Sequence, residues 1–434
     1  MARGGGTALP SNRRRFRSLR SPCKSFCHAV TRLPIYLDYA ATTPVDPRVA
    51  DLLGRYLTRE GVFGNPSSST HAFGRTAAQA VEAAREHVAA LLKADPREIV
   101  WTSGATEANN LALRGAMRAH ARKGRHLIAG KTEHKAVLDV CRSLEREGCA
   151  VTWLDPEPDG LIQPERLAAA LRPDTVLVSL MHVNNETGVV QDVAAVGALT
   201  RARGVLLHVD AAQGAGKLPI DLRTLPVDLL SLSAHKLYGP KGVGALYVRQ
   251  RPNRVRLEPL LYGGGQEWGL RAGTLPTHQI VAMGEACRIA GAEMADAHDR
   301  IRRLRDRLWR GLAELGEVAL NGHPERHWPG ILNVSFAGIA AEALLAAIPE
   351  IAVATGSACA SASNEPSHVL RAMGCDARRA RGAVRFSLGR FTTTAEIDYT
   401  LEAVGTAVRR LRDLSPLWGE SSGGASRAVD WAAP

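Results

Sequence analysis

The sequence predicts an α/β protein with a mostly parallel β-sheet in a large domain, followed by a smaller α+β domain. Two observations lead to this fold class. Between about residues 75 and 290, short runs of aliphatic residues alternate with segments of helical period, as in βαβ units. After residue 294, a long helical pattern leads into strand-like runs and a closing helical pattern. Hydrophobic residues make up 45% of the 434 residues, which is enough for a large core.

The first 33 residues carry most of the net charge. They contain eight Arg or Lys residues and no acid, so only +4 of the formal net charge of +12 belongs to residues 34–434. Such a segment is typical of a mitochondrial transit peptide, a nucleic-acid-binding arm or a disordered extension without a role. We expect the disordered extension, and with it a cytoplasmic bacterial protein that makes no direct contact with nucleic acid. A transit peptide would indicate the mitochondrial matrix instead.

No apolar run approaches the roughly 20 residues that cross a bilayer, so we expect no membrane contact. The seven cysteines are scattered and odd in number, which favours a reducing compartment over a disulfide framework.

Residues 34–434 divide into three predicted segments. Small polar residues near the C-terminus indicate a flexible tail. The segments are a large domain at 46–293, a small domain formed by 34–45 with 294–418, and the tail at 419–434.

Six short apolar runs in the large domain are predicted strands. Because the carboxyl ends of parallel strands meet at one edge of a sheet, polar residues that directly follow these runs are candidate site residues. The six runs are 98–101, 126–129, 151–154, 175–180, 205–209 and 228–232.

In the small domain, Thr393 and Glu396 form a capping box ahead of the closing helix.

Lys236 follows the last of these runs, after Ser233 and His235. A lysine just past a strand end is, taken alone, an ordinary surface residue. In a desolvated site its free amine could instead attack a carbonyl group, most often to form a Schiff base with pyridoxal phosphate (PLP). That hypothesis requires a phosphate site, an acid for the pyridine nitrogen and a group that stacks on the ring.

Two other strand ends offer the phosphate site and the acid. After the run 98–101, small residues lead through Thr106 into a helical pattern, where backbone N–H groups and the helix N-terminus can bind an anion. An ordinary turn is the alternative. Asp210 directly follows the run 205–209 and is expected to be partly buried, where a protonated pyridine nitrogen would be a suitable partner. A helix N-cap is the alternative for Asp210.

Two amides and an imidazole follow further strands. Asn184 and Asn185 come after the run 175–180 and could hold a phenolate or a substrate carboxylate, or could simply form a turn. His134 opens a helical pattern after the run 126–129, where it could stack on a ring and move protons, or lie on the surface. Each signal is weak alone, but chance does not readily place all of them at successive strand ends.

A second reactive centre is predicted in the small domain. Residues 355–363 are almost all small and follow a short apolar run, so the thiol of Cys359 is expected to be exposed and mobile. Most free cysteines are small buried hydrophobes, but those have bulky apolar neighbours. A mobile thiol suits sulfur transfer. In the strand-like segment 384–388, Arg385 could bind a substrate carboxylate bidentately or form a structural ion pair.

These residues resemble those of cysteine desulfurases within the class V aminotransferase superfamily, most closely the housekeeping type that serves iron–sulfur cluster assembly. The resemblance covers about residues 34–418 and implies a PLP-dependent transferase fold of type I and a homodimer. The segments that carry it are 37–44 (LDYAATTP), 102–107 (TSGATE), 132–135 (TEHK), 182–186 (HVNNE), 208–211 (HVDA), 235–242 (HKLYGPKG), 356–359 (GSAC) and 385–391 (RFSLGRF).

The resemblance also implies a role for each candidate residue. Lys236 would form the Schiff base with PLP, and His134 would cover the ring face and transfer protons. Asp210 would pair with the pyridine nitrogen and Gln213 with the ring hydroxyl, while Arg385 would hold the substrate carboxylate. The other implied contacts are Ala105, Thr106, Ser233 and His235 with the phosphate, Thr274 with the phosphate from the other subunit, and Asn185 with both cofactor and substrate carboxylate.

The implied reaction converts L-cysteine to L-alanine and leaves a persulfide on Cys359. That sulfur would pass to an iron–sulfur scaffold protein and to other acceptors, with tRNA thiolation among the uses. Through the persulfide, Cys359 would also be a transient ligand of a [2Fe–2S] cluster. Two alternatives stay open. One is a selenocysteine lyase or another class V PLP enzyme, although an aminotransferase would not need Cys359; the other is a non-catalytic adaptor that uses the basic N-terminal residues.

Overall fold

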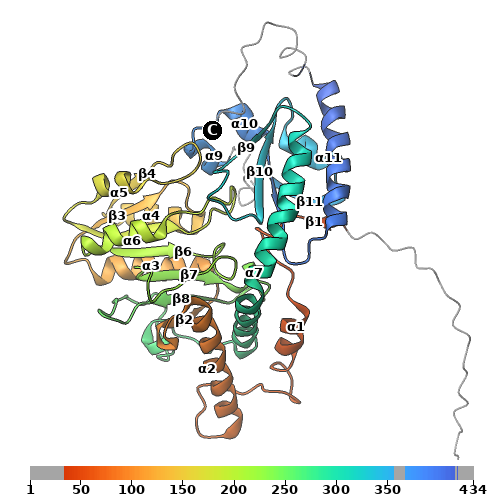
Figure 1. Cartoon of the computed structure of the whole chain (residues 1–434). Coiled ribbons are helices and arrows are strands. Elements are labelled where there is room, and N and C mark those ends of the chain that lie inside the picture. The colour runs from red at the N-terminus through yellow and green to blue at the C-terminus, as the bar shows by residue number, and fades with distance from the viewer. Residues whose placement is uncertain (1–33, 356–366, 416–417, 419–434) are drawn as a thin grey trace, which may run out of the picture. The chain divides into compact units, whose positions relative to one another are not determined.

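The computed structural model describes residues 34–355, 367–415 and 418 (Figure 1). The predictions for residues 1–33, for Cys359 and for the tail at 419–434 concern parts of the chain outside these ranges. The strands are β1 (Ile35–Tyr36), β2 (Ile99–Thr102), β3 (His126–Gly130), β4 (Ala150–Leu154), β5 (Thr175–Met181), β6 (Leu206–Asp210), β7 (Leu229–Ser233), β8 (Gly244–Val248), β9 (Val318–Leu320), β10 (Ile331–Phe336), β11 (Ile351–Ala352), β12 (Ala354–Thr355) and β13 (Ala383–Ser387). The α-helices are α1 (Pro47–Gly54), α2 (Ala72–Leu92), α3 (Ala105–Ala119), α4 (Lys135–Arg146), α5 (Pro164–Ala170), α6 (Val193–Ala202), α7 (Thr277–Ala313), α8 (Ala341–Ala347), α9 (His368–Ala372), α10 (Ala377–Arg381) and α11 (Thr394–Leu414). Short 3₁₀ turns are η1 (Pro96–Glu98), η2 (Ala234–Lys236) and η3 (Glu267–Gly269).

The larger sheet has seven strands in the order β2-β8-β7-β6-β5-β3-β4. Strands β4, β3, β5, β6 and β7 run parallel, and β8 lies antiparallel between β7 and β2. The predicted α/β class with a mostly parallel sheet is therefore confirmed, and each of the six predicted runs falls on an observed strand. Strand β8 is not among the predicted runs.

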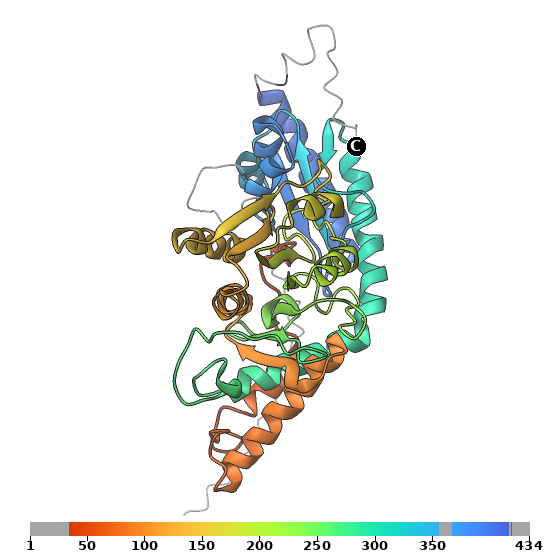
Figure 2. The same cartoon turned by 90° about the vertical axis from the view of Figure 1, so that its left-hand side faces the viewer.

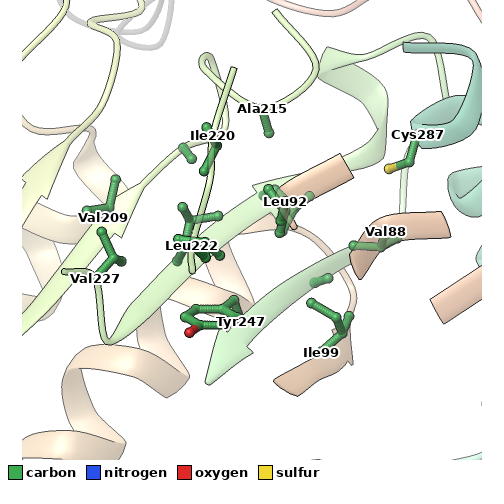
Figure 3. Close-up of a cluster of buried hydrophobic side chains, with 14 of the residues drawn as sticks. Val88, Leu92, Ile99, Val209, Ala215, Ile220, Leu222, Val227, Tyr247 and Cys287 are labelled. Atoms are coloured by element: carbon green, nitrogen blue, oxygen red, sulfur yellow. The ribbon is translucent and has the colours of Figure 1, made fainter. Parts of the chain in front are cut away.

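Helices lie on both faces of the seven-stranded sheet (Figure 1), and neighbouring strand residues pack into different hydrophobic clusters. On β3, for example, Leu127 packs into the hydrophobic cluster with α3 and α4, whereas Ile128 packs into the cluster with α2, α6 and the first half of α7. This alternation is the period of two that a strand imposes on its side chains. Figure 3 shows part of the second cluster, where Val88 and Leu92 of α2 meet Ile99 and other sheet residues, with Cys287 of α7 alongside.

Helix α7 packs into two hydrophobic clusters. Ile280 in its first half belongs to the cluster on the seven-stranded sheet, and Leu304 and Leu308 in its second half belong to the cluster on a four-stranded sheet. A helix of 37 residues is about 55 Å long, which lets it reach both. In Figure 2 the teal second half of α7 runs beside the cyan and blue strands of the smaller sheet.

The smaller sheet is antiparallel, with the order β12-β13-β10-β9. Helix α11 covers it together with α7 and α8, and begins at the predicted capping box of Thr393 and Glu396. The predicted boundary at residue 294 falls inside α7, and the division into two domains stays a prediction. Among the described helices, none has the length and apolar character that crossing a membrane requires.

His208 joins three strands of the seven-stranded sheet through its ring. Its Nδ1 lies 2.9 Å from the Ser179 hydroxyl on β5, and its Nε2 lies 3.0 Å from the Ser231 hydroxyl on β7. The side chain is fully buried, and this burial lowers the pKa of His208 to about 4. The neutral ring, with one donor and one acceptor nitrogen, matches two hydroxyl groups.

We expect His208→Leu to lower the free energy of unfolding by about 2–4 kcal/mol, because two buried hydroxyls lose their partner. The wild-type protein should also lose stability as the pH falls from about 6.5 towards about 4, since the unfolded chain binds the histidine proton more readily than the folded one. Urea unfolding of both proteins at about pH 7.5 and about pH 5 measures the two effects. His278→Leu, at a partly exposed position of α7, is the control. An equal acid sensitivity in wild type and His208→Leu would contradict this role.

Candidate active site

A cavity of about 490 Å³ lies at the carboxyl ends of the parallel strands. Segments that follow β2, β3, β5, β6 and β7 line it, together with residues 40–41 and a side chain of β13. Most predicted site residues come together here: Ala105, Thr106, His134, Asn185, Asp210, Gln213, Ser233, His235, Lys236 and Arg385. Thr274 is exposed and does not line this cavity, and Cys359 lies outside the described residues.

The N-terminus of α3 forms one wall of the cavity. Gly104 precedes the helix with φ 151°, and no side chain caps the first turn. A Cβ atom on Gly244 of β8 would lie 2.6 Å from the Gly104 Cα and 2.6 Å from the Leu232 carbonyl oxygen. Glycine at position 244 therefore allows two backbones to approach closely and sets where the helix begins. Backbone N–H groups at such a point, with Thr106 beside them, favour an anion.

His235 contributes a neutral imidazole to the same region. Burial, and then the positive charges of Lys236, Lys241 and Lys217, lower the pKa of His235 to about 4. Its Nδ1 lies 3.1 Å from the Thr42 hydroxyl. A neutral ring can offer one N–H to a phosphate without adding charge to a cavity that already holds several cations.

The amine of Lys236 is held by two backbone carbonyl groups. Its Nζ donates to the Ala40 oxygen at 2.6 Å and to the Ala41 oxygen at 2.7 Å. Thr43 fixes this segment, because its hydroxyl donates to the His235 carbonyl oxygen and accepts the Tyr238 N–H. The segment 40–43 belongs to the quoted motif 37–44, but no role for its carbonyl groups was predicted from the sequence. The structure thus holds Lys236 inside the cavity, and the surface alternative for this lysine is wrong.

Asp210 is the last residue of β6 and is buried, with 5% of its surface exposed. Its Oδ2 accepts a hydrogen bond of 2.7 Å from Asn109 of α3, and its Oδ1 accepts the Ala212 N–H. No α-helix begins at Asp210 in the described structure, so the N-cap alternative is wrong. Asn109 is a partner of a candidate site residue that the sequence pattern missed, since an asparagine inside a helical pattern carries no sign of a buried partner.

His134 is the N-cap of α4. Its Nδ1 accepts the Ala136 N–H at 3.1 Å, so in the neutral ring the proton resides on Nε2. The capping bond fixes the ring orientation while the ring lines the cavity. A histidine held in this way can exchange a proton through one defined nitrogen.

The asparagine pair divides between the two predicted alternatives. Asn184 forms the turn, because its Oδ1 accepts the N–H groups of Glu186 and Thr187. Asn185 lines the cavity. Glu186, which follows them, is buried, and this burial raises the pKa of its carboxyl to about 7.

Arg385 forms the structural ion pair that was one of its two alternatives, and its binding of a substrate carboxylate stays a prediction. Its Nη2 forms an ion pair of 2.7 Å with Asp38, and its Nη1 donates to the Asn185 carbonyl oxygen at 2.8 Å. The guanidinium is 2% exposed and still lines the cavity, and its Nε has no hydrogen-bond partner among the described residues. A buried N–H without a partner costs free energy unless a ligand satisfies it. Asp38 is a second residue whose partner the sequence did not indicate.

A metal site was predicted only at Cys359, through its persulfide, and that residue lies outside the described ranges. Among the residues that the structure does describe, no group of three or more His, Cys, Asp or Glu side chains could hold a metal ion. The residues that line the cavity include cations, a buried carboxylate, amides and imidazoles. Such a set suits an organic anion with a ring nitrogen.

The chain is similar to known proteins in sequence and in fold. The family model for aminotransferase class-V matches residues 35–400. Cysteine desulfurase IscS from Escherichia coli strain K12/DH10B and its counterpart from Shigella boydii serotype 18 are each 58% identical over 402 residues, which cover 92% of this chain and 99% of theirs.

Solved structures with the same fold include a NifS-like protein, with a TM-score of 0.81 and 37% identity over 87% of this chain and 100% of that one. DndA from Streptomyces lividans has a TM-score of 0.71 and is 47% identical, over 82% of this chain and 99% of its own. SspA, solved in complex with cysteine, has a TM-score of 0.73 and is 38% identical, over 83% of this chain and 100% of its own.

The close approach at Gly244 generates a prediction for the anion site. We expect Gly244→Ala to displace Gly104 and the start of α3, and so to weaken PLP binding about tenfold, since overpacking of this kind costs about 1–3 kcal/mol. Titration of the apoprotein with PLP, followed by visible absorbance, measures the dissociation constant. Gly54→Ala is the matched control, because a Cβ atom there would meet nothing within 4 Å. Equal affinity in both variants would contradict this function of Gly244.

Proposed function

The chain belongs to the aminotransferase class-V family and is a cysteine desulfurase, and we propose that it converts L-cysteine to L-alanine with PLP bound to Lys236 and that the sulfur passes to Cys359. One observation carries this proposal: a single cavity gathers the lysine amine, a buried carboxylate, a helix-capping histidine and a buried arginine whose Nε–H has no partner among the described residues. Each of them corresponds to one requirement of the reaction. The selenocysteine lyase and aminotransferase alternatives have no separate support in this geometry.

The residues present fit PLP. The cavity volume of about 490 Å³ lies in the range of small-molecule sites. Ala105, Thr106, Ser233 and His235 would hold the phosphate at the N-terminus of α3, Asp210 would hold the pyridine nitrogen, and Gln213 the ring hydroxyl. When bound, PLP supplies an electron sink that stabilises negative charge on the substrate Cα.

Asp210 is suited to hold the pyridine nitrogen as a cation. Asn109 donates to one of its oxygens and fixes the plane of the carboxylate, which leaves an anionic acceptor at the cavity wall. Asn185 would contact both the cofactor and the substrate. His134 would cover the ring face and, with its proton exchanged at Nε2, would move protons to and from the substrate.

The substrate carboxylate would bind to Arg385 and Asn185. Arg385 is kept in place by Asp38 and by the Asn185 carbonyl group, so only part of its guanidinium remains for a ligand. The thiolate of Cys359 would then attack the sulfur of L-cysteine. An S–S bond forms and the C–S bond breaks, the electron pair of that bond stays on carbon, and a proton from the site completes L-alanine. No external oxidant is required.

The partners follow from the same proposal. Thr274 would reach the phosphate of a second copy, and a homodimer would also cover apolar side chains that this chain exposes, such as Phe63, Phe73 and Tyr262. The persulfide on Cys359 would pass to an iron–sulfur scaffold protein and to other acceptors that include those of tRNA thiolation, with Cys359 as a transient [2Fe–2S] ligand. We place these steps in the bacterial cytoplasm.

The assignment of Cys359 and Lys236 is tested by replacing each with alanine. We expect wild type treated with L-cysteine to gain the mass of one sulfur on Cys359 and to release alanine. Cys359→Ala should bind PLP with an unchanged visible band but lose catalytic alanine formation, whereas Lys236→Ala should lose the visible band of the lysine adduct. Mass spectrometry of the intact protein and absorbance measure both results. Alanine formation at the wild-type rate in Cys359→Ala would exclude the desulfurase route through this thiol.

Arg385→Lys tests the carboxylate site. A lysine keeps the charge but loses the planar fork, so we expect kcat/KM for L-cysteine to fall about 10–100-fold. The fall should be accompanied by a higher KM, with PLP binding unchanged. Arg379→Lys is the control, because Arg379 bonds Asn321 and the Leu320 carbonyl outside the cavity. If both variants kept the wild-type KM, Arg385 would be a structural residue only.

A further inference from the structure

A lysine outside the cavity contacts one of the residues that line it. Lys217 Nζ donates to Gln213 Oε1 at 2.6 Å, and Gln213 Nε2 donates to the Ala40 carbonyl oxygen at 2.7 Å. Gln213 is buried and lines the large cavity, whereas Lys217 lines a separate small cavity of about 30 Å³. No carboxylate of the described residues forms an ion pair with Lys217, so the amide oxygen is the group that its amine meets.

The two contacts of Gln213 select a single orientation of its amide. A carbonyl oxygen can only accept, so Nε2 must face Ala40, and Oε1 then faces Lys217, which donates to it. The other N–H of Nε2 is then available on the side of the large cavity. The Ala40 oxygen also accepts the Lys236 amine at 2.6 Å, so the Gln213 amide and the Lys236 amine share one acceptor.

The surroundings of Lys217 are mostly uncharged or positive. Burial, and then the positive charges of Lys236 and Arg385, lower the pKa of Lys217 to about 7. Tyr39 and Tyr238 line the same small cavity, as do Glu293 and Arg390; Glu293 forms ion pairs with Arg48 and Arg390. A lysine kept at such a cost, with an amide as its partner, is not explained by a stabilising ion pair.

We propose that Lys217 is a positioning residue, which fixes the Gln213 amide with an N–H towards the cavity and strengthens that N–H as a donor to the ring oxygen of the cofactor. The strengthening applies to the charged form of Lys217, which is the main form below about pH 7, because a charged donor on Oε1 polarises the amide. This inference rests on the proposed function, since it requires PLP at Lys236 and Gln213 beside its ring oxygen.

The test uses the PLP-loaded protein and the pH dependence of its visible band. That band reports the proton on the nitrogen that Lys236 shares with the cofactor, and a weaker donor at the ring oxygen makes this nitrogen hold its proton more tightly. Lys217→Met should therefore raise the midpoint of the titration by about half a pH unit or more. Lys217→Arg should restore the wild-type midpoint to within about 0.2 pH unit, because it keeps a charged donor.

Gln213→Leu distinguishes an effect that acts through the amide from a direct charge effect. In that background Lys217→Met should no longer move the midpoint. An equal shift in both backgrounds, or no shift in the wild-type background, overturns the proposal. Lys123→Met is the matched control, because Lys123 donates to the Gly204 carbonyl away from the cavity. The titration midpoint of this variant should equal that of wild type.

Two further measurements keep the outcomes separate. Thermal melting of the apoproteins verifies that each variant is folded, and Lys217→Gln, which also removes the charge, should shift the midpoint in the same direction as Lys217→Met. A protein that shows no visible band with PLP in any variant, wild type included, would refute the proposed function. A normal band with an unchanged midpoint in Lys217→Met and Lys217→Gln would refute only the role of Lys217.

Discussion

The backbone segment 38–43 holds the candidate site together, because it bonds to a strand of the smaller sheet and to residues that follow strands of the larger one. On one side the N–H groups of Tyr39 and Ala40 donate to Ser387 of β13. On the other side the Ala40 and Ala41 carbonyl groups accept from Lys236, and Ala40 also accepts from Gln213. The guanidinium from the smaller sheet and the strand ends of the larger one thus meet at a short stretch of chain near residue 40. If this segment moved, the amine, the amide and the arginine would lose their common geometry.

The charges in the cavity explain what it can bind. Arg385 is partly neutralised by Asp38, and Asp210 is hydrogen-bonded by Asn109, so each buried charge has a partner but keeps an unfilled direction. Burial and the neighbouring lysines keep His235 neutral. The local charge of the cavity wall is positive around the N-terminus of α3 and negative at Asp210. A ligand that carries a phosphate at one end and a basic ring nitrogen at the other would match this distribution of charge.

Sequence patterns predicted six of the seven strands of the larger sheet and the edge at which the site lies, because the hydrophobic runs and the polar residues after them are local features. They did not separate candidates whose outcome differed: in the structure Asn184 forms a turn while Asn185 lines the cavity, and Asp210 caps no helix. Sequence patterns did not indicate that Asn109, Asp38 and Lys217 contact residues of the candidate site. The partners of Asn109 and Asp38 lie 101 and 347 positions away in the sequence, and the partner of Lys217 is a glutamine side chain with no distinctive pattern.

By itself the sequence determined the α/β class, the strands that lead to the site, and the reactive amine of Lys236 as a candidate, since these follow from periodicity and from residue type at a strand end. Only the tertiary structure decided which side chains share one cavity, which of them are buried, and in which orientation each is held. The physical reason is that burial and hydrogen-bond pairing depend on distances between segments remote along the chain. Alternation along one strand gives no information about a carbonyl group on another segment.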